Sequence, residues 1–441
     1  MTMATSQDQP GRRSRPCPQG APAAGGNEPA PTPGPAQKQT RLHLLALNPT
    51  DSVTHGFLPA AAALGLAVTL LTDQPDAHRS AYAKGASLPE ADVVGCDVRD
   101  FREVISRIGR LGRPGAVFTN SDHLQVQAAL AADYFGLPGK DWKAAHRAKD
   151  KAQLRRSLAA AGADTVRSAE LGPCDDPAGP EILGLPFPCV LKPREGVASE
   201  DVVLVGDPGE LAARCREIRA RRPGAALVVE EYLDGPLHTL ETLGDGHVLH
   251  TLGTFRTGLS PLPYFVEERL TLLPGPPRPH AADALRQLRA LGVGFGACHT
   301  EYVAQGDRAR IVEVNYRAIG DQCDLALADA LGIPLFAHIL RTHLGERLPG
   351  HLGGRADGRA RVEYVCADRG GTLTRAPSAS ETERDGVRLV YRPLRGTGEA
   401  HPLHRTNRDY LGVIRATGTD EGRIGRAVEE FLAAQRWEIT P

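Results

Sequence analysis

The first third of the chain alternates short apolar runs with helix-like segments. Residues 41–47 and 67–71 have the apolar pattern of strands, and residues 58–64 between them have that of a helix. A further apolar run at 116–118 leads into a helical pattern from 124 to 135. Strands that alternate with helices form parallel sheets covered by helices. This part of the chain therefore predicts a parallel βαβ domain.

A different pattern, with short β-rich runs and fewer helices, begins near residue 187. Gly244-Asp245-Gly246 separates two apolar runs and predicts a tight hairpin turn. Near the C-terminus, a strand-like run is followed by a helix for which Thr419 is the expected N-cap. The last eighty or so residues are otherwise less regular. The expected strands are 189–192, 202–205, 227–231, 239–243, 248–255, 299–304, 310–314 and 411–416, and the expected helices are 149–161, 208–222, one ending at Leu291, 323–331, 335–344 and 424–432.

These patterns divide the chain into four parts and predict an α/β protein. Residues 1–40 are dense in Pro, Ala, Gly, Gln and Ser and cannot bury enough apolar surface to fold, so we expect a disordered tail. We expect the parallel βαβ domain at 41–140, a central α+β domain at 141–347 and a small C-terminal α+β part at 348–441.

Composition excludes several classes of function. The 52 basic and 53 acidic side chains give a net charge of −1, which lacks the basic footprint of a nucleic-acid-binding protein. The longest apolar stretch falls short of the roughly 20 residues of a membrane span. Eight cysteines without CxxC or CxxH spacing argue against zinc and disulfide scaffolds, so we expect a cytoplasmic protein. Only seven of the 52 basic residues are lysines, and none follows Lys192.

Lys192 is the first candidate for chemistry, because it ends an apolar strand. A buried ammonium needs an anion, and a phosphate is our preferred partner, although an ammonium that reaches solvent is a common alternative. The loop that follows, 194–200, contains small residues up to Ser199 that let backbone N–H groups approach phosphate oxygens. A plain hairpin connection fits this loop nearly as well.

Carboxylates mark the ends of two other predicted strands. Glu230 and Glu231 close one strand, where backbone groups and a carboxylate can meet an adenine edge; ordinary acids at a strand end are the alternative. Strand alternation places Glu313, Asn315 and Arg317 on one face, and a turn lets Glu301 lie opposite Glu313. Two carboxylates, an amide and an arginine suit Mg²⁺ and a phosphate. A structural Arg317–Glu313 ion pair is the competing interpretation.

In order and spacing these motifs resemble the ATP-grasp superfamily, particularly its carboxylate–amine and amino-acid ligases. The matching pieces are Asp150-Lys151, Val190-Leu191-Lys192-Pro193, residues 230–235, Glu301 and residues 313–320. The resemblance implies an ATP-grasp architecture, ATP as cofactor, and one or two magnesium ions, with manganese as a substitute. The roles it implies are phosphate contacts for Lys151 and Lys192, adenine contacts for Glu230, Glu231 and Leu233, ribose contacts for Glu241, metal binding for Glu301, Glu313 and Asn315, and phosphoryl binding for Arg317.

Two departures from the family pattern affect these assignments. Relatives often place a ribose-binding acid where this chain has Leu237 and His238, and they often carry Asn-Pro-Arg where Tyr316 replaces the proline. The first leaves the ribose contacts open, and the second can reshape the substrate pocket. Candidate substrate residues are Arg256, Glu267, Arg269 and Asp321.

The resemblance implies a ligase that activates an amino-acid carboxylate as an acyl-phosphate and joins it to the amine of another amino acid. A dipeptide such as a γ-glutamyl product of a natural-product pathway is the expected outcome, with small-molecule partners and a homodimer as the possible assembly. A carboxyphosphate-forming enzyme is the alternative within enzymes. A nucleotide-binding regulatory protein without turnover is the alternative outside them.

Overall fold

The computed structural model describes residues 39–83, 89, 91–275 and 278–441. All but the last two residues of the predicted N-terminal tail, and part of the Pro-rich link after residue 274, lie outside the described residues. In the part of the chain that is described, no single helix is long and apolar enough to cross a membrane; one helix pair bent by 104°, Cys323–Leu331 with Leu335–His343, meets the length and composition limits together.

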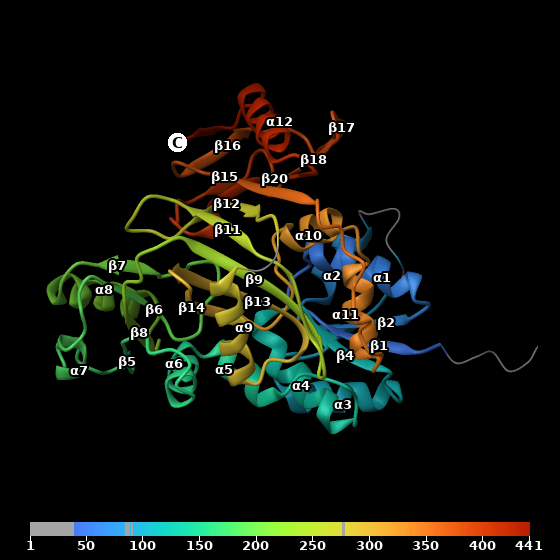
Figure 1. The fold of residues 1–441 in the computed structure, drawn as a ribbon, viewed down its shortest axis with the longest axis horizontal. Helices are drawn as coiled ribbons and strands as arrows, with labels where there is room; N and C mark the ends of the chain where they lie inside the picture. The colour runs from blue at the N-terminus through green and yellow to red at the C-terminus, as the bar shows by residue number, and fades with distance from the viewer. Residues whose placement is uncertain (1–38, 84–88, 90, 276–277) are drawn as a thin grey trace, which may run out of the picture. The chain divides into compact units, whose positions relative to one another are not determined.

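The predicted parallel βαβ domain is confirmed. Four parallel strands lie in the order β3-β2-β1-β4, with helices on both faces (Figure 1). The order reverses between β1 and β4, and ligands of open α/β sheets bind at the carboxyl ends of such neighbouring strands. The elements are β1 (Arg41–Leu45), η1 (Ser52–Phe57), α1 (Leu58–Ala63), β2 (Ala67–Thr72), α2 (Pro75–Ala83), β3 (Ala91–Gly95), α3 (Phe101–Leu111), β4 (Ala116–Thr119), η2 (Asp122–Leu124) and α4 (Gln125–Tyr134).

Alternating side chains of β1 bury both faces of this sheet. Leu42 and Leu44 belong to a core that extends toward α10 and α11, whereas Leu45 packs with Val104 and Ile108 of α3. Because both faces are covered, the strands carry nearly continuous apolar runs. The functional ends of the strands are thereby held on a rigid base.

A four-stranded antiparallel sheet follows, in the order β5-β8-β6-β7. Its core is formed by apolar side chains of β6 and β8 packed against α8. The predicted strand that ends in Lys192 is confirmed as β6, which pairs with β8. The elements up to this point are α5 (Trp142–Lys149), α6 (Lys151–Ala160), β5 (Ser168–Leu171), α7 (Pro180–Leu183), β6 (Cys189–Pro193), β7 (Val203–Val205), α8 (Pro208–Arg221) and β8 (Leu227–Glu231).

The largest sheet is mostly antiparallel, in the order β14-β13-β9-β11-β12-β15-β20-β18-β17, with β10 paired to β9. The hairpin predicted around Gly244-Asp245-Gly246 is confirmed. Its elements and those after it are β9 (Leu237–Asp245), β10 (Leu249–Gly253), β11 (Phe255–Leu259), β12 (Glu267–Leu272), α9 (Pro279–Leu291), β13 (Phe295–Gln305), β14 (Arg308–Asn315), α10 (Cys323–Leu331), α11 (Leu335–His343), β15 (Arg359–Cys366), β16 (Gly371–Arg375), β17 (Ser380–Arg384), β18 (Val387–Pro393), β19 (Ala400–His401), η3 (Asn407–Asp409), β20 (Tyr410–Gly418), α12 (Glu421–Ala434) and β21 (Glu438–Thr440).

Several predicted boundaries were wrong for identifiable reasons. The helix expected at 149–161 begins only at Lys151, because Asp150 adopts an extended conformation and its side chain caps the new helix. The last helix is capped by Asp420 rather than Thr419, with the Asp420 carboxylate accepting from the Arg423 amide. The run 248–255 is two strands, β10 and β11, because the β9 pairing shifts at Gly253. Residues 348–441, expected to form a small α+β part that is less regular than the rest, contain strands that extend the largest sheet.

Candidate active site

Two cations from different elements meet Glu230 inside the protein. Arg155 on α6 donates Nε and Nη2 to the Glu230 carboxylate at 2.8 and 2.7 Å. The Lys192 ammonium lies 2.8 Å from Oε2 of the same carboxylate, which is 3% exposed. Burial would raise the pKa of Glu230, but the two cations outweigh it and lower the pKa to about 2. The Glu230 carboxylate thus orders both Arg155 and Lys192 beside the end of β8.

Lys151 and Lys192 both reach strand β14. Lys151 Nζ lies 3.2 Å from Glu313 Oε1, and Lys192 Nζ donates to the Val312 carbonyl at 3.5 Å. Burial, and to a smaller extent Arg155 and Lys151, lower the pKa of Lys192, while Glu230 opposes them. Two ammonium groups held near one strand form a cationic pair that attracts a polyanion such as a nucleotide phosphate chain.

The β13–β14 hairpin brings the candidate metal ligands together as expected. Glu301 is the register partner of Glu313, and their side chains are 20% and 21% exposed. When the Asn315 side-chain amide is oriented with its nitrogen toward Glu313 and Asp122, it donates to Glu313 Oε1 at 3.3 Å and to Asp122 Oδ1 at 3.2 Å. A bulge at Val312 leaves that valine half-buried, so only Val314 packs behind the carboxylates as the alternation predicts.

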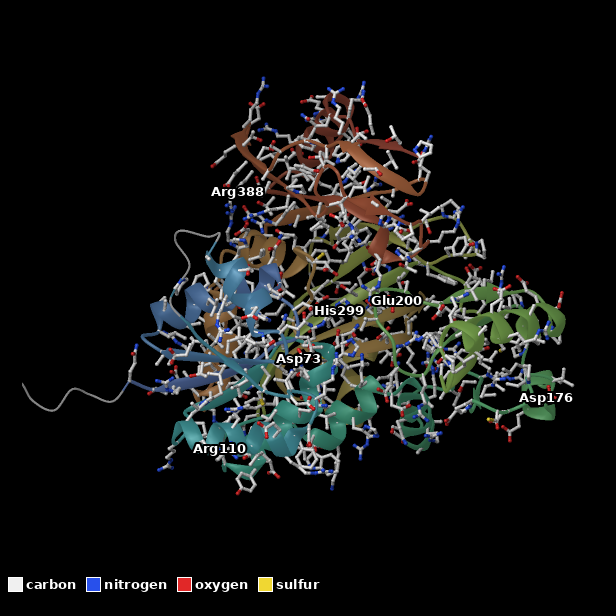
Figure 2. The ribbon with its side chains drawn as sticks, turned by 180° about the vertical axis from the view of Figure 1, so that it is seen from behind. Asp73, Arg110, Asp176, Glu200, His299 and Arg388 are labelled. Carbon is white, nitrogen blue, oxygen red and sulfur yellow. The ribbon has the colours of Figure 1, made fainter. Side chains whose placement is uncertain are left out.

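His299 is buried between two carboxylates of this sheet (labelled in Figure 2). Nδ1 lies 2.8 Å from Glu241 Oε1, and Nε2 lies 3.3 Å from Glu301 Oε1. Burial alone would lower the pKa of His299, but the two carboxylates raise it to about 10. The resulting imidazolium fixes the position of Glu301. It also occupies Glu241, the predicted ribose contact.

The donor set fits Mg²⁺ on chemical grounds. Over the described ranges, no group of three His, Cys, Asp or Glu side chains is arranged to hold a metal ion by itself. Mg²⁺ needs fewer protein ligands, since it takes one or two carboxylates and completes its shell with phosphate oxygens and water. Glu301 and Glu313 face each other across the hairpin, and the Asn315 amide oxygen can turn to the same space. The Lys151 ammonium beside Glu313 shows that this carboxylate already attracts a cation.

Arg317 follows β14 and is fixed by the parallel sheet. Its Nε and Nη2 both lie 2.7 Å from Asp122 Oδ2, just beyond the carboxyl end of β4. The Ala318 amide donates to Asn120 Oδ1 at 3.1 Å. Burial would raise the pKa of Asp122, but Arg317 keeps it below its usual value. The guanidinium is therefore ordered where the parallel sheet meets the β13–β14 hairpin.

Glu267 begins β12 and faces the same acidic region. Burial, reinforced by the Glu301 and Asp321 charges, raises the pKa of Glu267 to about 8. Asn407 donates from Nδ2 to Glu267 Oε2 at 3.2 Å, and its Oδ1 accepts from the Glu267 amide at 3.1 Å. Asp321 lies four residues after Arg317, in a left-handed backbone conformation with φ 54°. Both predicted substrate acids therefore adjoin the Arg317 site.

The loop after Lys192 is pinned by distant residues. Ala198 and Ser199 have positive φ angles of 58° and 56° although neither is glycine. The Ala198 carbonyl accepts from the Asn407 amide at 3.1 Å, and the Ser199 hydroxyl donates to the Phe265 carbonyl at 2.8 Å. Glu200 forms an ion pair with Arg408. Such strained backbone persists only where neighbours over-determine it, and it is common in ligand-binding loops.

Other predicted site residues are not part of this cluster. Arg269 forms a two-bond ion pair with Glu363, at 2.6 and 2.8 Å. Arg256 is exposed on β11, opposite His238 of β9. Glu231 accepts from Arg310 at 2.9 Å. Leu233 is half-buried just after β8, where its backbone adjoins the predicted adenine edge. Arg269 is therefore paired with Glu363 and Arg256 is exposed to solvent, whereas Glu231 and Leu233 lie at the end of β8 next to Glu230.

Asp122, His299 and Arg155 take part in the cluster but were not among the predicted site residues. Asp122 had an available signal, because polar residues after a parallel strand mark the ligand-binding edge of an α/β sheet. His299 is two residues before Glu301, and strand alternation places both on one face. Arg155 had no signal, because its partner Glu230 is 75 residues away.

Sequence comparisons give little information about function. No family model matches the sequence. An uncharacterised protein of Sinorhizobium fredii, y4rH, is 26% identical over 422 residues, which cover 91% of this chain and 84% of that protein.

Solved structures share the fold at low sequence identity. An L-amino acid ligase from Bacillus licheniformis superposes with a TM-score of 0.75 at 19% identity, over 92% of this chain and 100% of that one. A phosphoribosylglycinamide synthetase from Anaerococcus prevotii gives 0.67 at 14%, over 91% and 100%. The biotin carboxylase domain dimer of a Hydrogenobacter thermophilus 2-oxoglutarate carboxylase, solved with MgADP and bicarbonate, gives 0.67 at 16%, over 92% of each chain. The chain therefore has the fold of the ATP-grasp superfamily.

Proposed function

We propose that the protein is an ATP-dependent carbon–nitrogen ligase. It activates a substrate carboxylate as an acyl-phosphate, releases ADP, and transfers the acyl group to an amine with release of phosphate. The observation that carries this proposal is the register pairing of Glu301 with Glu313, with Lys151 on Glu313 and the ordered Arg317 two residues beyond Asn315. Positioning and charge neutralisation supply most of the catalysis in phosphoryl transfer.

Each residue of the site has a role that follows from its placement. Lys151 and Lys192 would hold the phosphate chain, and the Glu313 carboxylate that now contacts Lys151 would be one ligand of a metal ion. Glu301, Glu313 and Asn315 hold Mg²⁺, which neutralises charge on the transferring phosphoryl group when bound. Arg317, oriented by Asp122, binds the transferred phosphoryl oxygens or the acyl-phosphate. The β8 backbone, Glu231 and Leu233 border the adenine, with Ser199 on the loop over the phosphates.

The second substrate is an amine, and we propose an amino acid whose product is a dipeptide. Glu267 lies near the Glu301 and Asp321 charges, and Asp321 lies near Arg317, so this acidic region suits a substrate ammonium. The shared fold with an L-amino acid ligase supports the amino-acid class. A γ-glutamyl product in a natural-product pathway is the specific form that we propose. The dimeric carboxylase domain supports a homodimer as the assembly.

A phosphate-release screen with pairs of amino acids tests the proposal. Wild-type protein with Mg·ATP should release phosphate and ADP only when a productive pair is present, and mass spectrometry should detect the condensed product. Glu313→Gln serves as the inactive control, because it removes one ligand charge without changing side-chain size. AMP as the nucleotide product would contradict the proposal. Bicarbonate-stimulated turnover without an amino acid would instead favour a carboxyphosphate-forming enzyme.

A further inference from the structure

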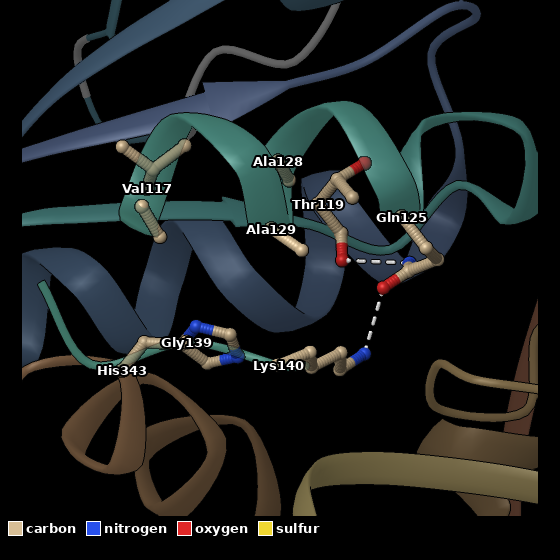
Figure 3. Close-up of a pocket in the computed structure, with 9 residues that line it drawn as sticks. Val117, Thr119, Gln125, Ala128, Ala129, Gly139, Lys140 and His343 are labelled. Atoms are coloured by element: carbon tan, nitrogen blue, oxygen red, sulfur yellow. Dashed lines mark hydrogen bonds between the residues drawn. The ribbon is translucent and has the colours of Figure 1, made fainter. Parts of the chain in front are cut away.

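Lys140 is a buried lysine outside the cluster described above. It lies in the segment between α4 and α5 and is 8% exposed. Beside it is a small cavity of about 10 Å³, about the volume for one water molecule, whose lining includes Thr119, Gln125 and His343 (Figure 3). Burying an ammonium is costly unless its protons are donated to acceptors.

One acceptor of the Lys140 ammonium belongs to the helix after β4. Nζ donates to Gln125 Oε1 at 2.7 Å, as drawn in Figure 3. The Gln125 amide nitrogen in turn donates to the Thr119 carbonyl at 3.2 Å and to the Ser121 carbonyl at 3.0 Å. These carbonyls flank Asn120 and precede Asp122. Lys140 therefore connects through Gln125 to the loop that orients Arg317.

The other acceptor is the carbonyl of Tyr316, which lies between Asn315 and Arg317. The same ammonium sits 4.5 Å above the centre of the Tyr316 ring, a cation–π distance. The ring is fixed at its far end, where the Tyr316 hydroxyl accepts from the Gly294 and Phe295 amides at 3.2 and 3.1 Å. Tyr316 thus packs against Lys140 with its ring buried, 2% exposed, among core side chains.

The space around the Lys140 side chain is narrow. Gly296 has φ +70°, and a Cβ there would come within 2.9 Å of Lys140 Cε. The nearby His343 stays neutral, since burial and the Lys140 charge lower its pKa to about 3. In a chain with only seven lysines among 52 basic residues, this position holds a compact lysine amino group rather than the larger guanidinium. Burial lowers the pKa of Lys140 to about 7, and its Nζ can donate in either protonation state.

We propose that Lys140 is a positioning residue for catalysis: its ammonium joins the Asn120–Asp122 loop to the Asn315–Arg317 segment and so sets where Arg317 and Asn315 stand. The two segments are almost 200 residues apart in sequence, and each supplies one side of the Arg317–Asp122 contact. One donor group that bonds to both segments fixes their separation. Because its kinetic test measures turnover, this inference rests on the proposed ligase function.

The test compares Lys140→Met with Lys143→Met, a matched change of an exposed lysine three residues along the chain. Methionine keeps an unbranched side chain as far as Cε but lacks the terminal amino group and cannot donate. We expect Lys140→Met to lower kcat by about 10- to 100-fold with KM for ATP changed by less than about 3-fold, because displacements near 1 Å cost about that much in rate. Lys143→Met should match the wild type in both. A kcat for Lys140→Met within about 2-fold of wild type, measured well below its Tm, would overturn the proposal.

A second measurement separates this inference from the proposed function. Unfolding free energies of Lys140→Met, Gln125→Met and the double variant form a cycle that needs no turnover. If the coupling energy between Lys140 and Gln125 is above zero but the wild-type protein releases no ADP in the screen, the positioning role of Lys140 stands and the proposed ligase function is rejected. If the effects of the two substitutions on unfolding free energy simply add while the wild type is active, only the positioning role of Lys140 is rejected. Partial recovery of kcat by added methylammonium in Lys140→Ala would further support it.

Discussion

Replacing Glu230 with Gln should lower the free energy of unfolding of the protein substantially. Glu230 is buried, and Arg155 and Lys192 lower its pKa from 4.5 to about 2. A shift of that size corresponds to about 3 kcal/mol of stability at pH 7. Removing one partner of a buried ion pair lowers the free energy of unfolding by a similar amount, about 3–5 kcal/mol, because the remaining cations lose their counter-charge.

The pH dependence of this loss has a definite sign. A carboxyl whose pKa is depressed on folding contributes its full stability above the unfolded value of 4.5, and that contribution disappears as the pH falls through 4.5 toward 2. The difference in unfolding free energy between wild type and Glu230→Gln should therefore be largest at pH 7 and about 1 kcal/mol smaller at pH 4.

Urea unfolding at pH 7, 5 and 4, followed by circular dichroism, measures this difference. Glu231→Gln is the control, since it changes the next residue of β8, whose side chain is 20% exposed and pairs with Arg310 near the surface. We expect the control to lose at most about 1 kcal/mol. Equal losses for Glu230→Gln and Glu231→Gln would refute the assignment of Glu230 to a buried, ion-paired anchor.

Three further predictions concern ligand binding, turnover and the pH dependence of stability. Lys192→Met should remain folded but bind Mg·ATP at least about 10-fold more weakly by calorimetry, since one phosphate contact is lost; unchanged affinity would contradict its role. Glu313→Gln should abolish metal-dependent ADP formation while leaving the urea midpoint near that of wild type; full activity would contradict the metal assignment. In metal-free protein, Glu267→Gln should gain stability relative to wild type as the pH rises from 4.5 to 8, because the raised pKa of Glu267 makes its ionisation oppose folding over that interval; a gain that shrinks over the same interval would reverse the sign.

Residues close together in sequence were predicted best. The apolar runs indicated the parallel sheet correctly, and the short turn after Gln305 correctly placed Glu301 opposite Glu313. These features depend on alternation and turn chemistry over a dozen residues, which the sequence displays directly. The helix start at Lys151 was missed because Asp150 reads equally well as helical or as a cap until its side-chain bonds are seen.

Long-range partners could not be predicted in the same way. Asp122 and Arg317 are 195 residues apart, and Glu230 finds Arg155 on a helix 75 residues earlier. No local pattern distinguishes Arg269, which pairs with Glu363, from Arg317, which faces the carboxylates. Such pairings follow from how the sheets pack, so they emerge only when the whole fold is assembled.

The contacts of Asn407 and Arg408 tie the C-terminal part of the chain to the loop that follows Lys192. These residues hold the loop around Ala198 and Glu200, more than 200 positions earlier in the sequence. Lifting that loop means breaking a backbone hydrogen bond and a surface ion pair that belong to the last forty residues. Under the proposed function, substitutions at Asn407 or Arg408 should therefore change the rate of nucleotide exchange while the residues proposed to bind the nucleotide stay the same.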